Sequence, residues 1–162
     1  MLKGKNAIIT GSNRGIGKAI VEAYAKNGAN IWACARKENP DFEREMKELS
    51  EKYHVWIKPI YFEMSDEEQI KGGVKRILAE KQNIDILVNN AGITRDGLLM
   101  KMAEEDFDAV IDTNLKGTFH CIRAVSRQML RQRSGRIINL SSVSGVLGNA
   151  GQANYSASKA GV

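Results

Sequence analysis

Short apolar runs alternate with longer helical patterns along the 162 residues of the chain. The runs lie at residues 6–10, 31–34, 55–62, 85–88 and 136–140. Continuous apolar runs of this length are typical of strands buried on both faces of a parallel sheet, which needs a helical crossover between strands. Because such crossovers are right-handed, the alternation predicts a doubly wound α/β fold with strand order 3-2-1-4-5. Residues 1–162 then form a single domain.

Helical segments are predicted where apolar residues recur every three or four positions. We expect the first helix to bury Ile16, Ile20, Ala23 and Tyr24 and to end at Gly28, and the second to begin at Asn39-Pro40 and to bury Phe42, Met46, Leu49 and Tyr53. Ser65 and Glu68 have the spacing of a capping box ahead of the third helix. Later helices are expected at residues 104–112, 116–133 and 149–162, with Phe119, Ile122, Val125 or Ser126, and Met129 on one face of the longest.

The composition excludes several classes of protein. With 43% hydrophobic and 27% charged residues, the chain should bury a core. No apolar stretch approaches the roughly 20 residues of a membrane span and no signal-peptide pattern is present, so we expect a cytoplasmic protein without a membrane partner. The net charge of +5 favours acidic partners in general, and we expect no nucleic-acid partner. Cys34 and Cys121 lie in apolar segments, so we expect structural thiols and no metal site.

A glycine-rich loop links the first strand to the first helix. It contains Gly11, Ser12, Asn13, Arg14, Gly15, Ile16 and Gly17, with the spacing G-x-x-x-G-x-G. Glycines permit a tight turn and a close approach of the backbone to a diphosphate, and the start of a helix offers free N–H groups at its positive end. The position of the loop between strand and helix therefore predicts a nucleotide-cofactor site.

The loop and the motifs that follow it resemble the short-chain dehydrogenase/reductase family. These motifs are Asn89-Asn90-Ala91-Gly92 after the fourth strand, Tyr155 followed by Lys159, and Ser142 and Asn114 ahead of them. Residues 89–102 and 148–155 look most like bacterial 3-oxoacyl-[acyl-carrier-protein] reductases. The resemblance covers the whole chain and implies a Rossmann-like fold. The family's last two strands would lie beyond residue 162, so the chain is expected to be C-terminally incomplete.

The resemblance implies an NADPH-dependent oxidoreductase that converts 3-oxoacyl-[acyl-carrier-protein] to the 3-hydroxyacyl product in fatty-acid biosynthesis. Tyr155 would donate the proton, Ser142 would bond the substrate oxygen, Lys159 would hold the nicotinamide ribose, and Asn114 would anchor a water of the proton relay. The chemistry of the residues agrees, because a free phenol is a weak acid at neutral pH and a lysine one helical turn away favours the phenolate.

Other interpretations stay open at this point. Taken singly, Tyr155 and Lys159 could form a solvated helix face, Ser142 could cap a turn and Asn114 could bond local backbone. The chain could also act on a sugar, an alcohol or a small ketone, or be an inactive nucleotide-binding fragment. His54 and His120 have no motif around them, and we interpret both as structural or exposed.

Charge favours NADP(H) over NAD(H) as the cofactor. An arginine at the end of the second strand would bind a 2′-phosphate, whereas a carboxylate there would bind the ribose hydroxyls. The chain has Arg36 at this place and Arg14 in the glycine loop, although Arg36 and Lys37 could simply be a solvated loop. The resemblance adds Asn90, Ala91, Gly92, Tyr155 and Lys159 to the cofactor-binding residues, together with Glu63 and Met64, where the family usually has Asp or Asn and a small apolar residue.

A basic group formed by Arg131, Arg133 and Arg136 precedes the fifth strand, next to the expected catalytic face. Acyl-carrier proteins are acidic, so the resemblance suggests that this group docks one, but basic residues also complement the end of a helix. The family typically forms tetramers through the long helix and the helix that bears Tyr155. The residues compatible with such packing are Phe119, Met129, Ala153, Ala157 and Ala160.

Overall fold

Five parallel strands form one sheet in the computed structural model, which describes residues 1–80 and 82–162. The strands are β1 (Asn6–Thr10), β2 (Asn30–Ala35), β3 (Ile57–Tyr61), β4 (Ile86–Asn89) and β5 (Arg136–Asn139). Their order is β3-β2-β1-β4-β5, and each neighbouring pair is parallel. The predicted α/β class and strand order are therefore confirmed.

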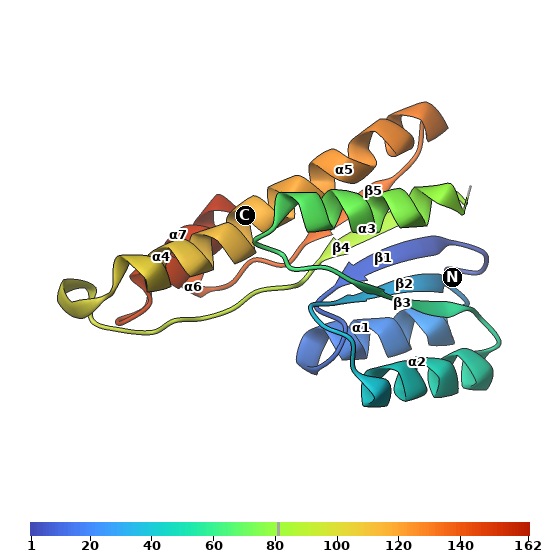
Figure 1. Cartoon of the computed structure of the whole chain (residues 1–162), viewed down its shortest axis with the longest axis horizontal. Coiled ribbons are helices and arrows are strands. Elements are labelled where there is room, and N and C mark those ends of the chain that lie inside the picture. The colour runs from blue at the N-terminus through green and yellow to red at the C-terminus, as the bar shows by residue number, and fades with distance from the viewer. Residues whose placement is uncertain (81) are drawn as a thin grey trace.

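Two layers of helices cover the two faces of the sheet (Figure 1). The layers consist of α1 (Gly15–Lys26) with α2 (Pro40–Tyr53), and of α3 (Glu67–Ala79) with α5 (Gly117–Gln132). Because successive side chains of a strand point to opposite faces, Ile9 belongs to the core under α1 and α2, while Ile8 belongs to the core under α3 and α5. The central strands β1, β2 and β4 are thus buried on both faces, as their apolar sequences require, whereas the residues of the edge strand β5 are exposed.

The remaining elements gather beyond the carboxyl ends of the strands (Figure 1). They are the short 3-10 helix η1 (Leu99–Lys101), α4 (Glu104–Ile111), the π-helical turn η2 (Asp112–Lys116), α6 (Ser144–Leu147) and α7 (Ala153–Gly161). The predicted helix at residues 149–162 is shorter than expected and begins at Ala153. Neither α6 nor the π-helical turn was expected from the sequence.

The helices begin and end at the predicted capping residues, with one exception. Gly28 has φ of 85° just after α1, and the side chain of Asn39 accepts a hydrogen bond from the Asp41 N–H at 2.9 Å, so both predicted signals are confirmed. The expected capping box at Ser65 and Glu68 is wrong by one residue. Asp66 is the N-cap of α3, and its carboxylate accepts from the Gln69 N–H at 3.0 Å.

The expected buried face of α1 is corrected, whereas that of α5 is confirmed at Val125 and Met129 and wrong at Phe119. In α1 the buried residues are Gly17, Val21 and Ala25, whereas Ile16 is 66% exposed. In α5 the buried face includes Cys121, Val125 and Met129, whereas Phe119 is 53% exposed. In α1 the small residues Gly17 and Ala25 let the helix lie close to the sheet, and a count of large apolar residues therefore misplaces its buried face.

Both cysteines are buried free thiols, as expected, and desolvation raises the pKa of Cys34 and raises that of Cys121 to about 12. His54 is exposed at the end of α2, and His120 lies 3.7 Å from the Glu67 carboxylate on the neighbouring helix. Within the described part of the chain, no helix has the length and apolarity that a membrane crossing needs.

Candidate cofactor and catalytic site

A cavity of about 480 Å³ lies at the carboxyl ends of β1, β2 and β4. The residues that line it are Thr10, Gly11, Asn13, Arg14, Gly15, Ile16, Gly17, Cys34, Ala35, Arg36, Phe62, Glu63, Met64, Asn90, Ala91, Gly92, Ile93 and Thr113. The lining includes the residues that the sequence assigned to the cofactor from the glycine loop, the second strand, residues 63–64 and the Asn90–Gly92 motif, with the exception of Ser12. This is the place where a doubly wound sheet binds its ligand.

The glycine loop has the shape of an anion cradle. Gly17 packs against the carbonyl oxygen of Gly11, and a Cβ on Gly17 would overlap that oxygen and lie 2.5 Å from Nδ2 of Asn90. Arg14 is the N-cap residue of α1, and its side chain makes no capping hydrogen bond to the first turn of the helix. The first N–H groups of α1 therefore lack a side-chain acceptor at the edge of the cavity, which is the arrangement that binds phosphate at a helix N-terminus.

Thr10 and Asn90 join the glycine loop to the end of β4. The hydroxyl of Thr10 accepts from the N–H groups of Asn90 and Ala91 at 3.1 and 3.0 Å. In return, Nδ2 of Asn90 donates to the carbonyl oxygens of Thr10 and Gly11 at 2.9 and 3.2 Å. The sequence places Thr10 at the end of the first strand, directly before the glycine loop, but gave it no role in the site.

Ser12 differs from its neighbours in the loop. Its side chain is fully buried, and its hydroxyl donates to the carbonyl oxygen of Ile9 at 2.7 Å. Its N–H donates to the carbonyl oxygen of Cys34 at 2.9 Å, which ties the loop to β2. The Ser12 hydroxyl therefore stabilises the turn through its bond to Ile9 and does not line the cavity.

Opposite charges meet at the end of the cavity beyond β2. Nε of Arg36 lies 3.8 Å from a carboxylate oxygen of Glu63, and both side chains are partly exposed. Met64 is buried, and its main chain and side chain pack against Gly117 at the start of α5. Arg36 and Arg14 offer two guanidinium groups on the lining, and Glu63 contributes one acidic group beside them.

Lys159 and Tyr155 come together on α7. Nζ of Lys159 lies 5.9 Å from the centre of the Tyr155 ring and donates to the carbonyl oxygen of Leu140 at 2.8 Å. A Cβ on Gly92, which lines the cavity, would lie 3.7 Å from Nζ. Burial lowers the pKa of Lys159, because it penalises the charged ammonium.

Asn114 lies in the π-helical turn beside Lys159 and Gly92. Its side chain is 1% exposed, accepts from the Ile93 N–H at 2.8 Å and donates to the Ile93 carbonyl oxygen at 3.0 Å. Its second amide hydrogen goes to the hydroxyl of Ser158 at 3.0 Å. The amide of Asn114 therefore connects the segment after β4 to α7. Short π-helical segments within α-helices are frequent at functional sites.

Ser142 begins the turn that leads into α6. Its hydroxyl accepts from the Ser144 N–H at 3.2 Å. The same segment is attached to α7, because the Ser141 hydroxyl donates to the Lys159 carbonyl oxygen at 2.6 Å and Gly145 packs directly on the main chain of Lys159. The sequence-predicted residues Asn114, Ser142, Tyr155 and Lys159 thus belong to segments that are bonded to or packed on α7.

The arginine group lies at the opposite end of the sheet, contrary to the expectation that it adjoins the catalytic face. Arg136 is the first residue of β5 and pairs with Ile86 at the amino end of β4. Arg131 and Arg133 lie at the end of α5, which delivers the chain to that same edge. The expectation was wrong because a helix before a parallel strand must end at the strand's amino end.

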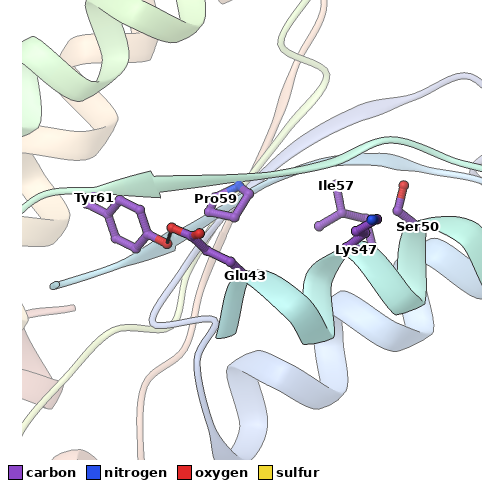
Figure 2. Close-up of a pocket in the computed structure, with 6 residues that line it drawn as sticks. All are labelled: Glu43, Lys47, Ser50, Ile57, Pro59 and Tyr61. Atoms are coloured by element: carbon purple, nitrogen blue, oxygen red, sulfur yellow. Dashed lines mark hydrogen bonds between the residues drawn. The ribbon is translucent and has the colours of Figure 1, made fainter. Parts of the chain in front are cut away.

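A second hollow, of about 330 Å³, lies between α2 and the outer strand β3 (Figure 2). Figure 2 shows Tyr61 directed toward Glu43, and the Tyr61 hydroxyl donates to the Glu43 carboxylate at 2.9 Å. Burial, with a further contribution from Glu43, raises the pKa of Tyr61 to about 12. None of the sequence-predicted site residues lines this hollow.

The sequence is similar to proteins of one known family. The family described as short chain dehydrogenase matches residues 5–162. The 3-oxoacyl-[acyl-carrier-protein] reductase FabG of Staphylococcus aureus (strain N315) is 48% identical over 158 residues, which are 98% of this chain and 64% of the relative.

Two further bacterial proteins are similar to the chain. The proteins of the same name from Thermotoga maritima and Salmonella typhimurium are 48% and 44% identical over 163 and 160 residues. These alignments cover 99% of this chain and 65% and 64% of the relatives, so the chain spans somewhat less than two thirds of their length. With the glycine-loop cavity, the parallel sheet and a family match over residues 5–162, the chain belongs to the short-chain dehydrogenase family.

Proposed function

We propose that the protein reduces 3-oxoacyl groups carried on acyl-carrier protein to 3-hydroxyacyl groups, with NADPH as the reductant, in fatty-acid biosynthesis. The observation that carries this proposal is the position of Gly92. It lines the cofactor cavity, and a Cβ there would meet both Asn114 and Lys159. Asn114 and Lys159 therefore lie against one wall of the cavity, which supports a cofactor bound there in reach of them. The names of the relatives support the choice of substrate.

The residues present fit a dinucleotide phosphate. The cavity of about 480 Å³ is of the size that small ligands occupy, and the glycine loop suits a diphosphate at the start of α1. Arg36 and Arg14 would hold the 2′-phosphate, and Lys159 the nicotinamide ribose. When bound, NADPH supplies the hydride, and the protein supplies binding and orientation.

The four catalytic residues have distinct proposed roles. Tyr155 donates a proton to the carbonyl oxygen, and Ser142 donates a hydrogen bond to the same oxygen. The ammonium of Lys159 favours the phenolate left on Tyr155. Asn114 anchors a water of the proton relay, and its main-chain carbonyl oxygen also accepts from the Thr118 hydroxyl at 2.7 Å.

An assay with an acetoacetyl thioester tests this function. We expect the protein to oxidise NADPH when the thioester is present, and Tyr155→Phe to lower kcat by about a hundredfold or more because the proton donor is lost. NADPH binding without turnover would contradict the reductase and favour a nucleotide-binding module. Turnover of a sugar or alcohol with NAD would instead favour another activity of the family.

Cofactor choice is tested by titration with NADPH and NADH. We expect Arg36→Gln to weaken NADPH binding by about tenfold and to leave NADH binding within about twofold, since a charge-assisted bond to the 2′-phosphate is lost. Arg127→Gln, an exposed arginine on α5, is the matched control and should change neither affinity. Equal losses for the two cofactors would contradict a 2′-phosphate contact.

The partner proposals follow from the same relatives. We propose an acidic acyl-carrier protein as the substrate carrier, docked by Arg131, Arg133 and Arg136. Since β5 is four residues long, roughly 13 Å, the carrier's acyl arm would have to span at least that length from the group to the catalytic end. We expect the affinity for the carrier to fall at high salt. It should also fall when these arginines are replaced by glutamine.

We further propose a cytoplasmic homo-oligomer, a tetramer as is typical of the family, assembled through α5 and α7. Phe119 at 53% exposure and the exposed Ala157 and Ala160 are available for such contacts, whereas Met129 is buried in the core of the chain itself. Sedimentation of the parent and of Phe119→Glu should show a smaller assembly for the variant.

A further inference from the structure

Two buried polar residues stand directly before Tyr155 and Lys159 in the sequence. They are Asn154 and Ser158, and both have 0% exposure. They are four residues apart on α7, so they share one face of the helix, next to the face that carries Tyr155 and Lys159. A buried polar side chain costs free energy unless its hydrogen bonds are made, so the partners of these two residues indicate what holds α7 in place.

Asn154 ties the start of α7 to two distant segments. Its Nδ2 donates to the carbonyl oxygen of Arg95 at 2.8 Å and to that of Asp106 at 3.2 Å. Its Oδ1 accepts from the N–H of Tyr155 at 2.7 Å. The segment after β4, helix α4 and the main chain of Tyr155 thus meet at one amide group.

Ser158 ties the next turn of α7 to Asn114. Its hydroxyl accepts from Nδ2 of Asn114 at 3.0 Å and donates to the carbonyl oxygen of Tyr155 at 2.8 Å. Asn114 in turn holds both main-chain groups of Ile93, beside the cofactor cavity. A chain of hydrogen bonds therefore runs from the cavity wall through Asn114 and Ser158 to the main chain of Tyr155.

We propose that Asn154 and Ser158 are positioning residues, which fix the rotation of α7 about its axis and so direct Tyr155 and Lys159 at Asn114 and the cavity. Successive residues of a helix are separated by about 100° of rotation, so even a small turn of α7 would move both side chains. Displacements of about 1 Å in a catalytic group can cost up to about a hundredfold in rate. The proposal rests on the proposed function for its catalytic consequence, but not for its structural one.

The structural consequence is tested without substrate, by ¹⁹F NMR of the full chain labelled with 3-fluorotyrosine. The chain has four tyrosines, and Tyr→Phe variants assign each resonance. We expect Ser158→Ala and Asn154→Ala to shift the Tyr155 resonance and leave those of Tyr24, Tyr53 and Tyr61 in place. Ser156→Ala is the matched control, because its hydroxyl has no hydrogen-bond partner among the described residues.

Two results in the NMR experiment would overturn the proposal. One is an unchanged Tyr155 resonance in Ser158→Ala, equal to that in Ser156→Ala. The other is an equal displacement of all four resonances, which would mean a general loosening of the fold. Should Asn154→Ala fail to fold, Ser158→Ala still decides.

The catalytic consequence is tested with the acetoacetyl thioester and NADPH. We expect Ser158→Ala to lower kcat by about tenfold to a hundredfold and to raise the KM for NADPH by a smaller factor, because Lys159 is displaced while the glycine loop is untouched. Values of kcat equal to those of Ser156→Ala would refute the positioning role. A parent protein without turnover would overturn the proposed function instead, and the NMR result alone would then decide on Asn154 and Ser158.

Discussion

The shape of the cavity at the glycine loop depends on the lack of a side chain at Gly17. This residue begins the buried face of α1 and packs on the Gly11 carbonyl oxygen and on Nδ2 of Asn90. The same amide of Asn90 holds the carbonyl oxygens of Thr10 and Gly11. A methyl group at this place would therefore push the glycine loop away from the end of β4.

Substitution of Gly17 by alanine tests this dependence. We expect Gly17→Ala to destabilise the protein by about 1–3 kcal/mol through overpacking and to weaken NADPH binding by at least about tenfold. Gly72→Ala on α3 is the control, since a Cβ there meets nothing within 4 Å, and it should stabilise the helix by about 0.5–1 kcal/mol. Urea unfolding and NADPH titration measure both effects, and equal behaviour of the two variants would contradict the close-packed loop.

Single residues also show where reasoning from the sequence succeeds. The glycine loop, Arg36 and the Asn90–Gly92 motif could be placed at the cavity because their positions after strands fix which edge of the sheet they reach. The buried Ser12 could not be separated from its neighbours, because the direction of a side chain inside a tight turn depends on local dihedral angles. Asn154 and Ser158 were missed for a similar reason: their partners lie tens of residues away in the sequence.

Among the helices, α3 shows how a start signal is decided. Both Ser65 and Asp66 are residues that favour the N-cap position, and the sequence alone favoured Ser65 because Glu68 follows it by three. In the structure Asp66 accepts from the Gln69 N–H and also from the Gln69 side chain at 2.8 Å. The main-chain hydrogen bond from Gln69 and, to a smaller extent, the bond from its side chain lower the pKa of Asp66.

A pair of alanine variants separates the two candidate caps. We expect Asp66→Ala to lower the urea midpoint of unfolding, because the first turn of α3 loses its hydrogen-bond acceptor, and Ser65→Ala to leave it unchanged. The effect of Asp66→Ala should fade in acid, since a carboxyl with a lowered pKa stabilises the fold only while it is ionised. A larger loss in Ser65→Ala would restore the capping box that the spacing predicted.

Strands were easier to predict than helix faces. Buried parallel strands appear in the sequence as uninterrupted apolar runs, so β1, β2 and β4 were located to within about two residues, which is the usual uncertainty of such ends. The faces of α1 and α5 follow small residues such as Gly17 and Cys121, which carry little weight in a count of apolar periodicity. The short helices η1 and α6 are too brief to have a period at all.

For the molecule as a whole, the burial of Lys159 predicts how stability changes with pH. Its pKa is lowered from 10.5 by desolvation. Between that lowered value and 10.5 the unfolded chain binds a proton that the folded chain has released, so the free energy of unfolding rises with pH in this range. At lower pH the folded chain holds a buried charge, and the contribution of Lys159 is at its least favourable.

Urea unfolding of the parent and of Lys159→Gln measures this contribution. The free energy of unfolding of the parent, relative to that of the variant, should increase as the pH is raised from about 7 to about 10. The ionisable groups that the two proteins share cancel in the difference. A difference that stays flat or falls over this range would show that Lys159 keeps its ordinary affinity for the proton in the folded state.

The topology of the whole molecule also explains why the position predicted for the arginine group was wrong. The strand order was predictable because crossovers have a fixed hand, but the arginine group was assigned to the catalytic edge from its proximity in sequence to the fifth strand. Arg136 shows the error, since it pairs with Ile86 at the amino end of β4. In a parallel sheet the residues before a strand and those after it lie at opposite edges.

The π-helical turn at Asp112–Lys116 has a mechanical consequence. It joins α4 to α5 without a break, so helical backbone continues from Glu104 to Gln132, and Asn114, about a third of the way along, is bonded to Ile93 and Ser158. These bonds fasten the π-helical turn to the segment after β4 and to α7. Amide hydrogen exchange should therefore be slower in the helical backbone around Asn114 than in the irregular connections at residues 93–98 and 148–152.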